Sequence, residues 1–228
     1  MDAYQTSSNA VVASAMVAGV MDGRDNRVMQ PPPSPDVASL ANQYLHVRVL
    51  LGMVVGLGLT HLLRHFARII DSPVRQRIYW VHLLWAISMF LYLLHFWWWE
   101  FRLVDTVRWT FMLYLFVALY ALLLYLLCAI IFPDSLDGYR GYDDYFHSRR
   151  KWFFGLLGLA YVVDLGDTWI KGRGYFEGFG PELELRSLAY VVLCAIAMIT
   201  PNRRFHAIFV VASLLYQLSW IVRQFETL

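Results

Sequence analysis

Residues 109–132 read WTFMLYLFVALYALLLYLLCAIIF, and this run contains no charged side chain. A helix needs about 20 apolar residues, each rising about 1.5 Å, to cross the roughly 30 Å of bilayer hydrocarbon. The run is long enough for that crossing and too apolar for the surface of a soluble protein. It predicts a transmembrane helix, which we place at residues 107–132.

Five further apolar stretches lie on either side of this helix. They cover residues 47–70, 78–99, 152–170, 183–200 and 205–222. The stretch at 183–200 is the weakest, because its uninterrupted apolar part, residues 187–200, is short enough for a re-entrant segment. It reaches membrane length only if Glu184 and Arg186 lie at the interface. The pattern predicts an all-α integral membrane protein, a bundle of about six transmembrane helices within residues 44–228.

The composition indicates the same class. Hydrophobic residues make up 59% of the chain, mean hydropathy is +0.48 and only 16% of residues are charged, against about 25% in soluble proteins. The net charge of +2 comes without a basic run interleaved with aromatic residues, so no nucleic-acid partner is expected. Cys128 and Cys194 both lie in apolar stretches, where cysteine usually acts as a small hydrophobic residue.

The first 43 residues have a different character. Residues 9–21 are mildly apolar, but no Lys or Arg precedes them, so a signal peptide is not predicted. The run Pro31-Pro32-Pro33-Ser34-Pro35 predicts a stiff, extended linker. We expect residues 1–43 to form a disordered or weakly interfacial tail.

Charge placement favours one orientation in the bilayer. With six spans, the connections after the first, third and fifth share one side, here called side B, and both termini share the opposite side A. Side B carries Arg64, Arg68, Arg75, Arg77, Arg140, Arg149, Arg150, Lys151, Arg203 and Arg204. Side A carries fewer cations near the membrane, because two of its arginines, Arg24 and Arg27, lie in the distant tail. The positive-inside rule therefore favours the cytoplasm for side B, by a small margin. We expect a multi-pass protein of a bacterial inner membrane.

A titratable cluster lies in the first span. His61 and His65 are one turn apart and share a helix face, while Arg64 and Arg68 form a second such pair on an adjacent face. Three interpretations stay open: half of a metal site, a proton-handling or pH-sensing pair, or a cytoplasmic interface whose side chains reach the headgroups. Gly52, Gly56 and Gly58 upstream predict close approach of a neighbouring helix and a central position for this span.

The fourth span carries the acidic counterpart. Asp164 and Asp167 are one turn apart and point the same way, at a depth that requires a partner. They predict either a structural ion pair or the mouth of a cation or proton site, and Glu100 is expected to enlarge the same acidic surface. The candidate cationic partners on side A are Arg48, Arg108, Lys171 and Arg186.

The connection 133–151 is the longest polar segment between spans. Its first half is rich in turn residues, and its second half predicts an interfacial helix leading into the fourth span. We expect Tyr142, Tyr145 and Phe146 to dip into the headgroup region. Arg149, Arg150 and Lys151, together with Arg68, are the predicted contacts to anionic lipid headgroups.

Several functional classes are excluded by spacing. His82 and His95 are thirteen residues apart and face away from each other, which disfavours stacked haems on one helix. Arg64 and Arg68 alone do not make a voltage sensor, and the two halves of the chain show no repeat typical of a transporter.

A polar route between the two clusters would pass mainly uncharged groups: Ser88, Tyr92, Tyr114, Tyr120, Tyr161, Tyr190 and Tyr216.

These observations favour a multi-pass protein that handles protons or small ions as a channel, a transporter or a pH-responsive component. Asp164 and Asp167, with Glu100, would gather the cation at one face. His61 and His65 would relay or sense protons near the other, with Arg64 opposing their protonation through like charge. The alternatives are a non-catalytic scaffold or accessory subunit, and a membrane enzyme acting on lipid or quinone; the non-enzymatic classes are favoured.

No cofactor is expected, and His61 and His65 are the only candidate metal ligands. The expected partners are the bilayer and its anionic headgroups, together with further copies of the chain or other subunits of a membrane complex.

Overall fold

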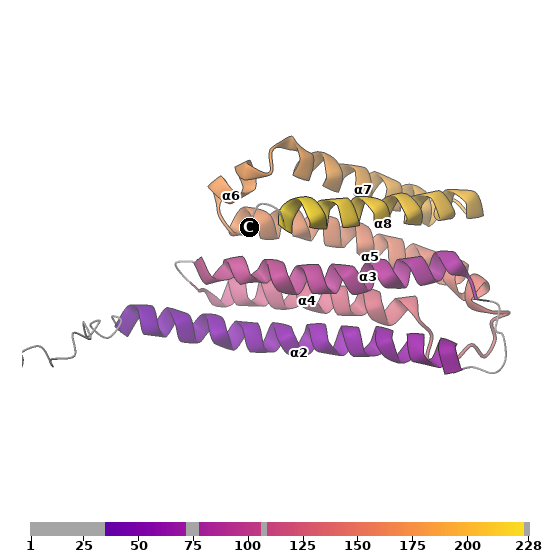
Figure 1. Ribbon diagram of the computed structural model, residues 1–228, viewed down its shortest axis with the longest axis horizontal. Helices are drawn as coiled ribbons and strands as arrows, with labels where there is room; N and C mark the ends of the chain where they lie inside the picture. Colours follow the sequence, from indigo (N-terminus) through magenta and orange to yellow (C-terminus); the bar gives the residue numbers. More distant parts are fainter. Residues whose placement is uncertain (1–34, 72–77, 106–108, 226–228) are drawn as a thin grey trace, which may run out of the picture. The chain divides into compact units, whose positions relative to one another are not determined.

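In the computed structural model, every regular element among residues 35–71, 78–105 and 109–225 is a helix (Figure 1). The chain divides into two units, Met1–Asp36 and Val37–Leu228, and the helical bundle belongs to the second. The elements, in chain order, are α2 (Pro35–Asp71), α3 (Trp80–Trp99), the 3₁₀ helix η1 (Glu100–Asp105), α4 (Phe111–Ile131), α5 (Tyr142–Ile170), α6 (Arg173–Gly178), α7 (Pro181–Ile199) and α8 (Arg203–Phe225).

Among the residues that the structure describes, five segments are long and apolar enough to cross a membrane. They are Asn42–Asp71, Trp80–Leu103, Phe111–Ile131, Tyr142–Ile170 and Arg203–Arg223. The predicted all-α membrane bundle is therefore confirmed. The remaining predicted span corresponds to α7, which has 19 residues but carries Glu182, Glu184 and Arg186 in its first two turns. Because of these three charges, α7 is not among the five membrane-spanning candidates. This agrees with the sequence analysis, in which residues 183–200 were the weakest of the six predicted spans.

Two boundaries differ from the expected ones. Helix α2 begins at Pro35, inside the stretch predicted as tail, while residues 1–34 lie outside the described part of the chain. Helix α5 begins at Tyr142, so the predicted interfacial helix and the fourth span form one continuous element. The flanking residues 133–141 contain no helix, as the turn-rich sequence predicts.

Five helices form a closed ring. Contacts run from α3 to α4, from α4 to α5, from α5 to α7, from α7 to α8 and from α8 back to α3. The α5–α7 contact is close because small residues lie on it: a Cβ built at Gly158 would be 3.4 Å from the Cβ of Cys194. One turn further along, the rings of Tyr161 and Tyr190 stack with centroids 3.9 Å apart.

Helix α2 lies outside this ring, along α3 and α4 (Figure 1). The central position predicted from its glycines is therefore wrong. Bulky side chains fill the glycine notches: a Cβ at Gly58 would lie 2.8 Å from a methyl of Leu93, and one at Gly52 would lie 3.0 Å from the Trp97 ring. Gly56 faces open space. The notches receive side chains of α3 without drawing the two backbones together.

The outer faces of the helices are apolar. Leu57, Leu119 and Leu215, on α2, α4 and α8, are 60%, 55% and 63% exposed. The inner faces bury Trp85, Tyr120 and Phe154 almost completely. An apolar exterior on several helices would be costly in water and is what a bilayer requires.

Candidate functional site

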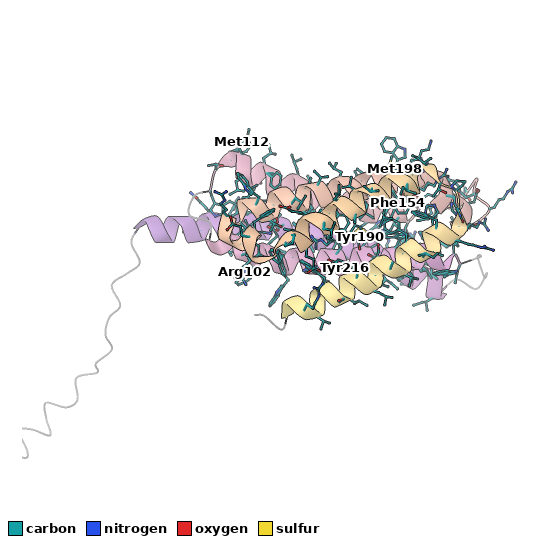
Figure 2. The ribbon with its side chains drawn as sticks, turned by 90° about the horizontal axis from the view of Figure 1, so that it is seen from above. Arg102, Met112, Phe154, Tyr190, Met198 and Tyr216 are labelled. Atoms are coloured by element: carbon teal, nitrogen blue, oxygen red, sulfur yellow. The ribbon has the colours of Figure 1, made fainter. Side chains whose placement is uncertain are left out.

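A polar cavity of about 60 Å³ lies inside the ring, at the end where α3 and α5 terminate. Its walls come from α3, η1, α4, α5, α7 and α8, so residues far apart in the sequence meet there. Figure 2 shows two of them, Tyr190 and Tyr216, between Arg102 near one end of the bundle and Met198 nearer the other. Hydropathy alone does not predict a polar cavity at this depth.

The first ion-pair group in the cavity is centred on Lys171. Its ammonium lies 2.8 Å from Glu100 Oε1 and 2.5 Å from Asp167 Oδ2. The three side chains are only 1%, 4% and 3% exposed. Local structure explains the meeting, because Lys171 directly follows α5, one turn beyond Asp167, and Glu100 begins η1 directly after α3.

The environment of Lys171 keeps it charged. Burial alone would lower the pKa of its ammonium, but the Asp167 and Glu100 carboxylates more than compensate and raise that pKa. Lys171 is thus a fixed positive charge between two acids.

The second group is centred on Asp164. Arg186 Nη2 lies 2.6 Å from Asp164 Oδ2, and the Tyr120 hydroxyl donates to Oδ1 at 3.2 Å. The hydroxyls of Tyr120 and Tyr92 are 3.1 Å apart, which extends the network to α3. The Arg186 guanidinium also lies over the Trp220 ring, 4.5 Å from its centroid.

The cavity holds more acids than fixed bases. Glu100, Asp164 and Asp167 face Lys171 and Arg186, so one negative charge has no counter-charge if all five groups are ionised. Glu100 Oε2 and Asp167 Oδ1 are buried and accept no hydrogen bond from an N–H or O–H donor of the described residues, while the two carboxyl groups themselves lie within hydrogen-bonding range of each other. An uncompensated buried charge is costly, so a proton or a cation is needed to balance it. His95, on α3, lines the same cavity and is a further group that can hold a proton.

Most tyrosines of the predicted polar route converge on this cavity. Its lining includes Tyr92, Tyr120, Tyr161, Tyr190 and Tyr216. Tyr114 is not part of the lining and contacts the Phe111 ring instead. Ser88 is next to the cavity, because its hydroxyl donates to Oε1 of the lining residue Gln217 at 2.8 Å. This hydrogen bond joins α3 to α8.

An aromatic segment covers the mouth of the cavity. The connection 172–180 carries the short helix α6, and Gly172 (φ 127°) and Gly180 (φ 60°) allow the backbone to fold over the end of α5. Phe179 lines the cavity, with its ring centroid 6.0 Å from that of Trp99 and 5.7 Å from that of Trp220. Sequence reasoning missed this cover and His95; the glycine-rich pattern KGRGYFEGFG at 171–180 was the available signal.

The predicted acidic residues therefore come together, whereas the predicted histidines lie elsewhere. Asp164, Asp167 and Glu100 share the cavity, and two of the four suggested partners, Lys171 and Arg186, meet them. Arg48 instead lies over the Phe101 ring, 4.4 Å from its centroid. Arg108 is outside the described residues. His61 and His65 lie near the opposite end of α2, beside Phe132 at the end of α4.

The histidine pair packs against the bundle. The His65 ring stacks on Phe132 with centroids 4.8 Å apart, and its Nδ1 lies 2.8 Å from the His61 carbonyl oxygen. Within the described part of the chain, no group of three His, Cys, Asp or Glu side chains has the arrangement of a metal site, so the metal hypothesis gains no third ligand there. Arg64 and Arg68 are exposed, as expected for side chains that reach headgroups.

Three further histidines belong to the same end of the bundle. His82 lies 4.7 Å from Phe132 and 5.2 Å from Tyr142, measured between ring centroids. His147 and His206 are 5.4 Å apart by the same measure, and Phe146 contacts both. Counting histidine spacing along single helices missed this layer, because its members come from α2, α3, α5 and α8.

Aromatic side chains fill the interior near the histidine layer. The Trp85 ring lies 5.4 Å from Phe154 and 5.2 Å from Phe209, and all three are buried. Phe154 also stacks on the His206 ring, with centroids 5.4 Å apart, so this apolar cluster directly adjoins the histidines.

The basic run at the start of α5 is divided between several environments. Arg149 donates to the Tyr139 hydroxyl at 3.2 Å, Arg150 donates to the His147 carbonyl at 2.7 Å, and Lys151 is exposed. The sequence predicts that three aromatic residues dip into the headgroup region, namely Tyr142, Tyr145 and Phe146. This prediction is wrong. They are buried in the protein, because this part of α5 packs against the ends of α3 and α4.

Comparison with known proteins identifies no relative: no family model matches the chain, and no curated protein or solved structure is significantly similar to it.

Proposed function

We propose that this chain is a multi-pass inner-membrane protein that takes up and releases a proton or a small cation in the cavity lined by Glu100, Asp164 and Asp167. The observation that carries the proposal is the excess of acids over fixed bases in the cavity, where Glu100 Oε2 and Asp167 Oδ1 accept no hydrogen bond from a donor of the described residues. Ionisable groups at membrane depth are costly, and they commonly mark ion or proton pathways.

The size of the cavity supports a small ligand. Its volume is about 60 Å³, whereas pockets for organic ligands usually measure about 300–1,000 Å³. One water needs roughly 10–15 Å³ by the same kind of measure, so the space suits a few waters or a partly hydrated ion. This favours proton or inorganic-cation uptake over binding of a lipid or quinone.

The opposite end supplies a second set of titratable groups. In this proposal His61 and His65, with Arg64 beside them, exchange protons with the cytoplasm. The surplus of cations on side B supports a cytoplasmic position for this end of the bundle. The aromatic cluster of Trp85, Phe154 and Phe209 would then act as the barrier that has to rearrange between the two ends.

Flux through reconstituted protein tests the proposal. Purified protein in liposomes is challenged with a proton or potassium gradient while internal pH and membrane potential are recorded with dyes. Wild type should produce flux above empty vesicles, and Glu100→Gln and Asp164→Asn should abolish it. Glu177→Gln is the matched control, because Glu177 pairs with Arg173 at the same end but is exposed. Absence of flux from folded wild-type protein would contradict a transport role.

A second candidate function is supported by a specific observation. Lys171 and Arg186 already pair with the acids, as in a non-catalytic accessory subunit whose polar groups join helices. This alternative predicts stable co-purification of other membrane subunits from native membranes. It also predicts that Glu100→Gln alters assembly and leaves ion leak unchanged.

A further inference from the structure

A second cavity lies at the other end of the bundle, outside the ring. It is an open groove of about 540 Å³ between the end of α4, the connection 132–141 and the start of α5. Its apolar wall is formed by Ala129, Ile130 and Trp152. This volume is in the range of small-molecule sites, unlike that of the acidic cavity.

The groove adjoins the end of a helix that is long and apolar enough to span a membrane. Helix α4 ends at Ile131 on the rim of the groove, and Trp152 is 66% exposed beside it. Exposed tryptophans favour the level of the bilayer where headgroups meet hydrocarbon. Deeper along the same two helices, Leu126 and Leu159 are 44% and 48% exposed, so an apolar track leads from the groove into the membrane.

Two opposite charges flank the opening. Arg149 is exposed, and among the described residues its side chain donates only to the Tyr139 hydroxyl, which leaves donors of the guanidinium for an anion. Asp134 is also exposed, and its carboxylate forms no ion pair or hydrogen bond with the described residues. One cation and one anion on the same rim, neither of them in an ion pair with the described residues, suit a zwitterion better than a simple anion.

We propose that this groove binds a phospholipid with a phosphoethanolamine headgroup. Arg149 and the Tyr139 hydroxyl hold the phosphate, Asp134 accepts hydrogen bonds from the primary ammonium, and the acyl chains follow Trp152, Leu126 and Leu159. A choline headgroup offers no N–H donor to Asp134, and a glycerol headgroup offers no positive charge. The site is independent of the proton or cation site, and neither proposal depends on the other.

Native mass spectrometry of the delipidated full chain tests this site. The protein is titrated with short-chain phosphatidylethanolamine, phosphatidylglycerol and phosphatidylcholine, and circular dichroism confirms that each variant is folded. Wild type should bind the ethanolamine lipid roughly tenfold more tightly than the other two, the effect expected of one charge-assisted hydrogen bond. Arg149→Gln should weaken binding of all three lipids. Arg149→Lys, which keeps the positive charge, should bind them more tightly than Arg149→Gln but less tightly than wild type.

Asp134→Asn is the decisive variant. It should bring the ethanolamine and glycerol lipids to within about twofold of each other, because only the ammonium contact is lost. Lys151→Gln is the matched control, since Lys151 is exposed two residues from Arg149 and does not line the groove. Equal binding of the three lipids by wild type, or unchanged preference in Asp134→Asn, would overturn the proposal. Competition by free phosphoethanolamine as strong as by the lipid would assign the site to a soluble ligand instead.

Discussion

At the scale of single residues, Lys171 organises the acidic cavity. Its ammonium contacts Glu100 and Asp167 at once, and all three side chains are almost completely buried. Removing one partner of a buried ion pair leaves charge that solvent cannot reach, whereas removing charge from both sides is much less harmful.

Lys171→Met should therefore lower the free energy of unfolding by about 3–5 kcal/mol. Thermal unfolding in detergent, followed by circular dichroism, measures this loss. Combining Lys171→Met with Asp167→Asn should recover part of the stability, because one of the stranded carboxylates is then neutral. Arg173→Gln, which breaks an exposed pair at the same end, should change stability by less than about 1 kcal/mol. Equal effects of Lys171→Met and Arg173→Gln would contradict this description of the cavity.

Residue spacing predicts part of this site. Because helix periodicity is 3.6, the placement of Asp164 and Asp167 on one face could be predicted from their separation, and both do line the cavity. For the cationic partners of these two acids, the sequence left four candidates. Which of the four pairs with them depends on how α5 packs against α7 and on where α3 gives way to η1. A lone histidine such as His95 carries no signal in sequence, and only the ring of helices places it near the acids.

At the scale of elements, the glycines of α2 show the limit of motif reasoning. The small-residue pattern correctly predicts a packed face, but it cannot distinguish backbone contact from a notch filled by a large side chain. Gly58 receives Leu93, and Gly56 faces open space.

The same substitution should thus have opposite outcomes at these two positions. Gly58→Ala should destabilise the protein by about 1 kcal/mol or more, because its Cβ would lie 2.8 Å from a methyl of the buried Leu93. Gly56→Ala should be neutral or stabilising by up to about 1 kcal/mol through helix propensity. Melting temperatures of the two variants provide the comparison. A destabilised Gly56→Ala would indicate a partner on that face of α2.

A partly exposed ion pair joins helix α7 to α8. Arg223 donates to both carboxylate oxygens of Glu182, at 2.7 and 3.0 Å, and Tyr216 donates to Oε1. The hydrogen bonds from Arg223 lower the pKa of the Glu182 carboxyl below its ordinary 4.5. A lowered pKa means that this pair stabilises the fold above pH 4.5 and loses its effect as the pH falls through the folded-state pKa.

Glu182→Gln should consequently reduce the melting temperature at pH 7, and the difference from wild type should disappear as the pH is lowered below 4.5. A series of melting curves in detergent between neutral and acidic pH measures this. Glu184→Gln is a suitable control, because Glu184 is an exposed neighbour on the same helix. A difference that persists unchanged in acid would show that the carboxylate charge is not what matters.

At the scale of the whole molecule, titratable groups collect at two ends of a bundle with an apolar exterior. Acids gather in the cavity near η1 and α6, and histidines gather near the start of α5, with Trp85, Phe154 and Phe209 packed beside the histidines. Hydropathy predicts the class of fold because span length and charge content follow directly from the bilayer. It does not predict which helices neighbour each other, and the ring α3–α4–α5–α7–α8 is what turns separate polar residues into a site.

We propose that the acidic cavity holds a proton or a small cation that balances its third carboxylate. Infrared difference spectroscopy of the reconstituted protein tests this proposal, with pH and then sodium or potassium concentration as the variable. We expect a carboxyl or carboxylate band that responds to one of these changes in wild type and in Glu177→Gln, and that is lost in Glu100→Gln or Asp167→Asn. A spectrum in which no carboxyl group of the cavity responds to protons or to either cation would contradict it.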